Sequence, residues 1–311
     1  MAVTSRACAL LLLLALAHCA SPAGARTLLV GESREFKLPS EAVRAAKDGD
    51  RVVIDPGEYF DCAVVSANNV TIEGASPDGT AVLTDKVCQG KALLVTTGRD
   101  ITLRNLTLQR ARVPDMNGAG IRAEGVNLTI ERVKFINNQN GILAAANPPS
   151  TITIRDSEFL RNGYCSPCAH GIYVNALKLL RVENSKFADT RQAHHIKSRA
   201  ARTEIIGVET RDGDNGTASY HIDIPNGGSL VVRDTTMQKG PKAENRSTAI
   251  MIGAEGVNQP TREIIIENNT MINTGSYQTF MVTNLTATEA MLKGNRLTGQ
   301  VQPLKGDGEV R

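Results

Sequence analysis

Short runs of alternating apolar and polar residues recur along most of the chain. Nine segments share one pattern, a strand-like run followed by an Asn, Asp or Gly turn and one more apolar residue, as in LTIERVKFINN from Leu128. Their equivalent positions are spaced by 23 to 34 residues: Ile72, Leu103, Ile130, Ile154, Val182, Ile205, Val232, Ile266 and Leu292. Repeats of this length with period-two alternation and no sustained helical pattern predict a β-solenoid.

The turns and short strands favour an all-β, right-handed parallel β-helix of about nine coils, spanning residues 26–299 as one domain. One coil cannot bury its apolar side chains alone, whereas stacked coils place them in continuous inward ladders. We expect Ser40 to cap a short helix over residues 41–47 that covers the first coil. Residues 300–311 are rich in Gly and charge, which predicts a flexible tail.

The first 25 residues predict a signal peptide. Arg6 precedes an apolar run at residues 9–17, and Ala23-Gly24-Ala25 resembles a cleavage site. No later apolar run approaches the length of a membrane span, so we expect an exported, periplasmic or extracellular protein without a membrane anchor. Four cysteines follow, which export allows to pair as Cys62 with Cys88 and Cys165 with Cys168. A redox or zinc role for the CSPC segment is the weaker alternative.

Composition adds little to this picture. Of the 311 residues 41% are hydrophobic and only 4% aromatic, which suits stacked strands. The net charge of +3 is too small to indicate nucleic-acid binding. No feature predicts an oligomer, and we expect a monomer.

The run PSEAVRAAKDGDRVVIDPGEY from Pro39 to Tyr59, the following VTIEG and the later HGIYV resemble proteins of the pectate-lyase-like superfamily. The resemblance spans residues 27–299 and is strongest to the branch with mannuronan C5-epimerases and chondroitinase-B-like lyases. It implies a right-handed parallel β-helix and chemistry on an acidic polysaccharide. The chain lacks the DPHD segment of the epimerases and the acidic cluster with which pectate lyases hold calcium.

A second ladder, Ile121, Ile142, Ile172, Ile196, Ile222 and Ile250, indicates where a site can lie. If these isoleucines point inward, the residues one before, one after and three after point outward on one sheet. This face would gather polar side chains from neighbouring coils: Arg122, Tyr173, Asn175, His195, Lys197, Arg199, His221 and Asp223.

Such a cluster suits removal of the proton beside a uronate carboxylate. His195 or His221 would act as base, and Lys197 and Arg199 would hold the carboxylate. Tyr173 would move a proton, Asp223 would orient a histidine, and Arg122 and Asn175 would contact the sugar chain. We therefore predict catalytic roles for His195, Lys197, His221 and Tyr173, and substrate binding by Arg199, Asp223, Arg122 and Asn175. Lyase and epimerase outcomes remain open.

Two other classes of function remain open as well. The chain could be a non-catalytic carbohydrate-binding protein, or a structural or adhesive solenoid without any site. We expect no resident metal, although the segment Asp212-Gly213-Asp214-Asn215 is oxygen-rich enough to bind calcium weakly. A solvated loop is the better interpretation of that segment, because strong calcium sites need six or more oxygen ligands.

Overall fold

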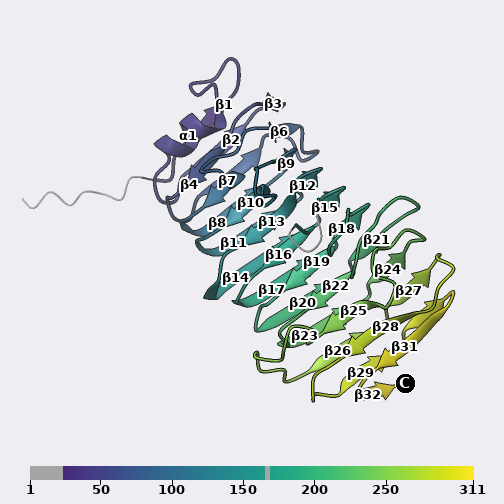
Figure 1. Cartoon of the computed structure of the whole chain (residues 1–311). Helices are drawn as coiled ribbons and strands as arrows, with labels where there is room; N and C mark the ends of the chain where they lie inside the picture. The colour runs from purple at the N-terminus through teal and green to yellow at the C-terminus, as the bar shows by residue number, and fades with distance from the viewer. Residues whose placement is uncertain (1–23, 165–168) are drawn as a thin grey trace, which may run out of the picture.

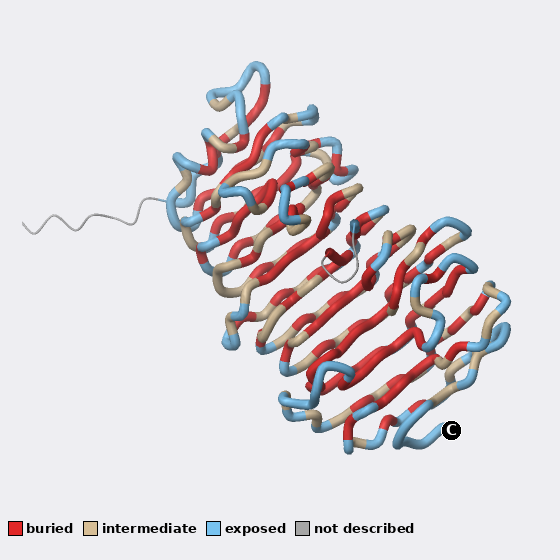
Figure 2. Tube along the Cα trace, viewed as in Figure 1, coloured by how far each residue is buried: buried red, intermediate tan, exposed pale blue. Residues whose placement is uncertain are grey.

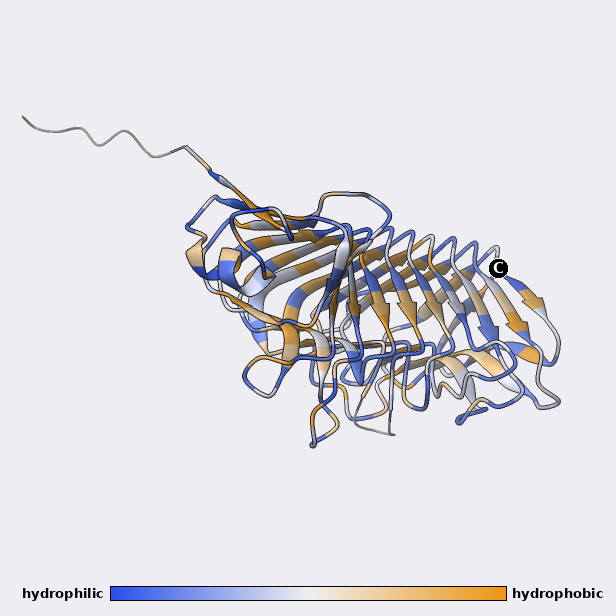
Figure 3. Ribbon diagram, turned by 90° about the horizontal axis from the view of Figure 1, so that it is seen from above, coloured by the Kyte–Doolittle hydropathy of each residue, from blue (hydrophilic) through white to orange (hydrophobic). Residues whose placement is uncertain are grey.

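The computed structural model describes residues 24–164 and 169–311, which form one short helix and 32 strands. The strands coil into a right-handed parallel β-helix with three sheets, and each turn visits sheet A, then sheet B, then sheet C (Figure 1). Viewed from above, successive turns follow one another along the axis, with helix α1 at one end and the C-terminus at the other (Figure 3).

Sheet A has twelve strands in this order: β1 (Thr27–Val30), β2 (Arg51–Ile54), β5 (Thr71–Gly74), β8 (Arg99–Arg104), β11 (Val126–Glu131), β14 (Asn147–Arg155), β17 (Leu177–Glu183), β20 (Arg202–Ile206), β23 (Ser229–Arg233), β26 (Ile264–Glu267), β29 (Ala290–Lys293) and β32 (Gly308–Val310). Sheet B has ten: β3 (Gly57–Tyr59), β6 (Ala81–Thr84), β9 (Leu106–Gln109), β12 (Lys134–Ile136), β15 (Glu158–Leu160), β18 (Lys186–Ala188), β21 (Glu209–Arg211), β24 (Thr236–Lys239), β27 (Thr270–Asn273) and β30 (Arg296–Thr298).

Sheet C also has ten strands: β4 (Ala63–Val65), β7 (Ala92–Thr96), β10 (Ala119–Ala123), β13 (Asn140–Ala144), β16 (Ile172–Val174), β19 (Ile196–Ser198), β22 (Ile222–Ile224), β25 (Thr248–Ile252), β28 (Thr279–Asn284) and β31 (Val301–Lys305). The described residues therefore make about ten turns, one more than the nine repeats indicate, because the turn of β2, β3 and β4 precedes the first repeat position at Ile72.

The predicted repeat register is confirmed throughout sheet A. Each of the nine equivalent positions pairs with the next, from Ile72 beside Leu103 to Ile266 beside Leu292. All nine side chains are buried in one continuous core, and buried residues follow the strands along the whole solenoid (Figure 2). In-register stacking thus produces the inward apolar ladder that no single coil could bury.

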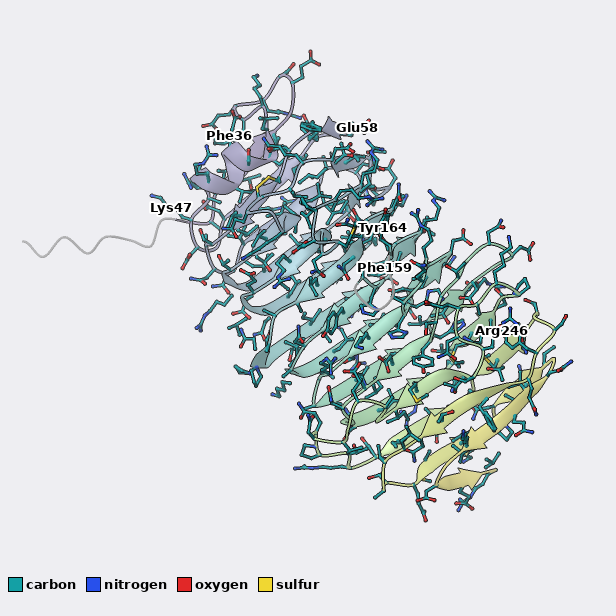
Figure 4. The ribbon with its side chains drawn as sticks, in the orientation of Figure 1. Phe36, Lys47, Glu58, Phe159, Tyr164 and Arg246 are labelled. Atoms are coloured by element: carbon teal, nitrogen blue, oxygen red, sulfur yellow. A yellow bond between two sulfur atoms is a disulfide. The ribbon has the colours of Figure 1, made fainter. Side chains whose placement is uncertain are left out.

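A stack of phenylalanines fills the middle of this core from sheet B. The ring centroids lie 4.5 Å apart for Phe135 and Phe159 and 4.4 Å apart for Phe159 and Phe187, with nearly parallel planes. Figure 4 labels Phe159 at mid-length of the solenoid. The stack ends at Phe187, because the next positions in register are Thr210 and Met237.

Helix α1 (Pro39–Ala45) covers the first turn, as predicted, and buries Ala42 and Val43 in the core. The predicted cap at Ser40 is wrong, because Leu38 is the N-cap residue. The Glu41 carboxylate instead accepts the backbone N–H of Leu38 at 3.1 Å, and the N–H of Ser40 donates to Asp61.

The predicted flexible tail after Gly299 is also wrong. Strand β31 pairs with β28, and strand β32 pairs with β29. The preceding turn presents a row of unpaired backbone groups, and residues 301–310 satisfy them despite their polar composition.

The Cys62–Cys88 disulfide is present, with Cα atoms 5.5 Å apart. The predicted Cys165–Cys168 pair and residues 1–23 of the predicted signal peptide lie outside the described residues. Among the described residues no helix is long and apolar enough to cross a membrane.

Replacing Phe159 by Ala should lower the free energy of unfolding by about 3–5 kcal/mol, because the substitution opens a cavity between two stacked rings. Phe60→Ala is the matched control, since that ring is 66% exposed and should contribute little. Urea denaturation of both variants measures the difference. Equal losses in the free energy of unfolding would show that the phenylalanine stack does not stabilise the core.

Candidate functional site

The outward row of sheet C has the register that the sequence predicts. Arg122 pairs with Leu143, Leu143 with Tyr173, Tyr173 with Lys197, and Lys197 with Asp223. Adjacent parallel strands lie about 4.8 Å apart, so Tyr173, Lys197 and Asp223 span about 10 Å along the axis.

Lys197 and Arg199 converge on one carboxylate. The Lys197 ammonium lies 2.6 Å from Oε1 of Glu255, and a terminal nitrogen of Arg199 donates to Oε2 of the same side chain at 2.6 Å. Arg199 also donates from Nε to the Tyr173 hydroxyl at 3.1 Å and from its other terminal nitrogen to Asn226. We call Lys197 and Arg199 the carboxylate clamp.

Both cations also lie near the Tyr173 ring. The Lys197 ammonium is 5.8 Å from the ring centroid and the Arg199 guanidinium is 5.7 Å away. Cations at this distance are attracted to the electron-rich face of an aromatic ring. The ring therefore helps to fix the clamp, while its hydroxyl lies beside the Arg199 guanidinium.

Asp223 lies under the clamp, with Oδ2 3.2 Å from the Lys197 ammonium and 3.4 Å from Nε2 of His194. Its carboxyl is almost completely buried, and this burial raises its pKa to about 6 despite the nearby lysine. The pKa of His194 is lowered well below its ordinary value, mainly by burial. His194 is therefore neutral at neutral pH.

An aromatic stack borders the clamp at the start of these strands. The His194 ring stacks on His170 at 5.0 Å and on Tyr220 at 4.9 Å. Because Nδ1 of His194 accepts the backbone N–H of Tyr220, the proton of the neutral ring lies on Nε2, which faces Asp223. In this form His194 donates to the carboxylate and cannot accept a proton at Nε2.

The prediction that His195 and His221 share the outer face with Lys197 is wrong. Both side chains are completely buried on the other side of the sheet. The His195 ring meets the edge of Phe187 at 6.3 Å, and its Nε2 lies 3.0 Å from Oδ1 of Asp212. A sugar on the outer face cannot reach either imidazole, so neither histidine is available as its base.

The volume available inside the solenoid, at the corner between sheets B and C, explains why the two histidine side chains point inward. The positions equivalent to His195 in earlier turns are Gly120, Gly141 and Gly171. A Cβ atom at Gly141 would meet the Phe159 ring at 2.8 Å, and one at Gly120 would meet Phe135 at 2.8 Å. Where the phenylalanine stack ends, the same positions can hold imidazoles that point inward. The three glycines at the equivalent earlier positions, each followed in the next turn by a phenylalanine of the stack, are the sequence signal for this arrangement.

His195, Asp212 and His221 form a buried group that we call the buried His–Asp–His group. Nδ1 of His195 lies 2.8 Å from the Thr190 hydroxyl, and Nδ1 of His221 lies 2.7 Å from the Thr210 hydroxyl. Burial alone would raise the pKa of Asp212, but the imidazoles of His221 and His195 outweigh it and hold the pKa below its ordinary value.

The ligand atoms of this group lie within 4.8 Å of one another, and a nitrogen and carboxylate set of this kind is able to hold zinc. The buried ammonium of Lys239, which donates to the Ser219 carbonyl at 2.6 Å, acts electrostatically on both Asp212 and His221. That positive charge already balances Asp212 and opposes a divalent cation. We therefore assign this group a structural role.

The predicted solvated loop at residues 212–215 is an exposed turn at Asp214 and Asn215, but the prediction is wrong for Asp212. Its side chain is fully buried, and Oδ2 accepts the backbone N–H of Gly240 at 2.9 Å. The carboxylate is therefore committed to the interior and does not face outward to hold calcium.

Arg122 and Asn175 are not brought to the clamp. Arg122 lies three strands before Lys197, about 14 Å away at the usual strand spacing, and its Nε is 3.3 Å from Glu124. Asn175 donates its amide to the Ala144 carbonyl at 2.9 Å. Sequence reasoning missed Glu255 and Asn226, which lie in turns after strands and carry no repeat signal.

The outer face has a separate pocket beyond Asp223. Met251, Thr283 and Lys305 follow Asp223 in register, and together with Ser247, Gln278 and Phe280 they line a pocket of about 180 Å³. A chain-like ligand could therefore extend from the clamp along the axis toward Lys305.

No protein-family model matches the sequence, and no curated protein sequence matches it. Among solved structures, the chain is similar to an alginate lyase from Paenibacillus sp. str. FPU-7, with 17% identity and a TM-score of 0.68 over 91% of this chain and 99% of that one. It is also similar to the pectate lyase Pel9A, with 14% identity and a TM-score of 0.60 over 93% of this chain and 79% of that one. The protein thus has the pectate-lyase-like, right-handed parallel β-helix fold, as its sequence resemblance implies. Fold by itself does not fix an activity.

The buried His–Asp–His group should make folding sensitive to acid. Burial lowers the pKa of His221 to about 4 from an ordinary value of 6.5. The stabilisation is therefore complete above about pH 6.5 and is lost as the pH falls toward 4, because the unfolded chain takes up a proton that the folded chain excludes.

His221→Gln should remove this contribution, so that its stability falls less steeply than that of the wild type by up to about 3 kcal/mol across the window. Urea denaturation at several pH values measures the slopes. Ile224→Val, on strand β22 directly after His221, is the control and should shift the curve without changing its slope. Parallel curves for His221→Gln and the wild type would contradict a buried neutral imidazole.

Proposed function

We propose that this chain is an exported polysaccharide lyase that binds a uronate-containing glycan along the outer face of sheet C and cleaves it by β-elimination. The single observation that carries this proposal is the carboxylate clamp, in which Lys197 and Arg199 grip both oxygens of one carboxylate beside the Tyr173 hydroxyl. Two of the solved structures with a similar fold are by name an alginate lyase and a pectate lyase, which supports an acidic polysaccharide as substrate.

The clamp matches the demand of the reaction. The hydrogen at C5 of a hexuronate becomes acidic only when the charge that develops on the adjacent carboxylate is stabilised. An ammonium and a guanidinium supply that stabilisation, and the planar guanidinium also fixes the orientation of the carboxylate. Substrate positioning and charge neutralisation would thus come from the same two side chains.

Tyr173 is the group on this face that we assign to proton transfer. Because Nε of Arg199 donates to the tyrosine oxygen, that oxygen is held in place beside the clamp. Tyr173 as tyrosinate takes the C5 proton, the C5–H electron pair forms the C4–C5 double bond, and the bond from C4 to the glycosidic oxygen breaks. The tyrosine then returns its proton to the departing oxygen, so atoms and charges balance.

Asp223 and His194 have a supporting role in this scheme. Asp223 holds the Lys197 ammonium from below, and the neutral His194 holds Asp223 through its Nε2–H. The clamp lysine is therefore fixed by partners that do not touch the sugar. The Cys62–Cys88 disulfide supports export, because disulfides persist mainly in oxidising compartments.

The purified protein should release unsaturated products from at least one of alginate, polygalacturonate and chondroitin, detected by the ultraviolet absorbance of the new double bond. Tyr173→Phe removes one oxygen atom and should lower the rate by about 10²–10⁴, the usual contribution of acid–base catalysis. Lys178→Ala, at an exposed position on sheet A, is the control and should leave the rate unchanged.

Two results would point elsewhere. Inversion at C5 seen by NMR without new absorbance would identify an epimerase, and binding without any change in the glycan would identify a carbohydrate-binding protein. Lys197→Ala is a poor test, because it leaves Asp223 buried without its cation and should impair folding. Arg199→Ala is the better clamp variant, because that guanidinium is more exposed.

A further inference from the structure

We infer that Glu255 occupies the position of the substrate carboxylate, so that a uronate binds only by displacing this side chain from the clamp. This inference rests on the proposed function and names a specificity-determining residue within it. Glu255 becomes an internal competitor that a free carboxylate can replace and a neutral or esterified sugar cannot.

The first support is the geometry of the three side chains. The two oxygens of Glu255 are divided between the clamp residues, one at 2.6 Å from the lysine and the other at 2.6 Å from the arginine. A planar carboxylate held through both oxygens by two cations is the arrangement that a uronate would need at the same place. The carboxylate of Glu255 and the carboxylate of a uronate therefore cannot occupy the clamp at the same time.

The second support is the contrast in exposure. The Lys197 side chain is only 7% exposed, whereas that of Glu255 is 44% exposed. The carboxylate lies over the lysine from the solvent side, in the path of an arriving ligand. Because 44% of its side chain is exposed, Glu255 can rotate into solvent, while Asp223 stays 3.2 Å from the Lys197 ammonium.

The backbone of the Glu255 loop is fixed, so the displacement needs only a side-chain movement. The N–H of Glu255 donates to the Pro225 carbonyl at 2.8 Å, and the N–H of Asn258 donates to Asn226 at 3.1 Å. Gly253 and Gly256 have φ values of +84° and +92°, which let the loop reverse direction above sheet C. Rotamer changes at exposed side chains are fast, so the loop need not unfold.

The competitor stays charged at the pH where a uronate is charged. Burial alone would raise the pKa of Glu255, but hydrogen bonds and charge from Lys197 and Arg199 outweigh it and keep the pKa below its ordinary value. An incoming carboxylate exchanges one charge-assisted contact for another at little net cost. A methyl-esterified or neutral sugar would leave the clamp without a counterion and is rejected.

The variant Glu255→Gln tests this inference, because it keeps the shape of the side chain and removes its charge. A clamp that is free for about one-tenth of the time binds ligand about tenfold more weakly than an open one. We therefore expect Glu255→Gln to bind defined trisaccharides of mannuronate or galacturonate about tenfold more tightly than the wild type, measured by calorimetry. Discrimination between free and methyl-esterified trigalacturonate should narrow at the same time.

Glu263→Gln is the matched control. Glu263 ends the same loop and pairs with Arg202, the first residue of strand β20 in sheet A, and its side chain is 39% exposed. Its substitution removes the same charge from the same loop but should change affinity by less than about twofold, as expected for an exposed ion pair. Glu255→Ala is a second test variant and should tighten binding in the same direction, and thermal melting of all variants confirms that they are folded.

The failure of this inference is distinguishable from the failure of the proposed function. If the wild type binds or cleaves a uronate but Glu255→Gln binds it equally or more weakly, Glu255 is a ligand-supporting residue and the inference is overturned while the proposed function stands. If neither the wild type nor Glu255→Gln binds any of the free trisaccharides, the proposed function fails and the inference fails with it.

Discussion

Every feature of this molecule depends on the pairing of each strand with the equivalent strand of the next turn. The parallel ladders satisfy backbone groups between turns, and the same register stacks apolar side chains into the core. A consequence is that residues about one repeat apart in sequence become neighbours at about 4.8 Å per step. Tyr173, Lys197 and Asp223 meet for this reason, and a shift of one residue in any of their strands would move the side chain to the opposite face.

Periodicity therefore predicts the strands well and the corners poorly. The ladders through Ile72 and Ile121 could be aligned from the sequence, because alternation within a strand has only two outcomes. His195 and His221 each stand immediately before a strand, where alternation no longer determines the direction of a side chain. Their orientation depends on the volume left by the phenylalanine stack, which is a property of the neighbouring turn.

Glu255 could not be predicted from the sequence for a similar reason. Glu255 lies in the turn between β25 and β26, and it reaches Arg199 across two turns of the solenoid. Nothing in the local sequence indicates such a contact, because the length and path of a turn are not constrained by the repeat. Strands β31 and β32 were missed for the opposite reason, since residues 301–310 are mostly polar or glycine but the exposed edge of the preceding turn gives them partners.

The strands β19 and β22 separate two polar groups with different requirements. Behind them, the buried His–Asp–His group is closed to solvent, its two Nδ1 atoms contact threonine hydroxyls, and the nearby ammonium of Lys239 offsets the charge of Asp212 electrostatically. On the outer face of the same strands, Lys197 is nearly as buried as those groups, although it belongs to the carboxylate clamp at the surface. A buried ammonium is costly unless it is paired, and Asp223, with a pKa raised to about 6 by burial, is an incomplete partner near that pH. Glu255 supplies the remaining charge when no ligand is present. The requirement that Lys197 be neutralised in the folded protein thus explains why Glu255 lies on the clamp, and in the function proposed above the carboxylate of the glycan takes over this role.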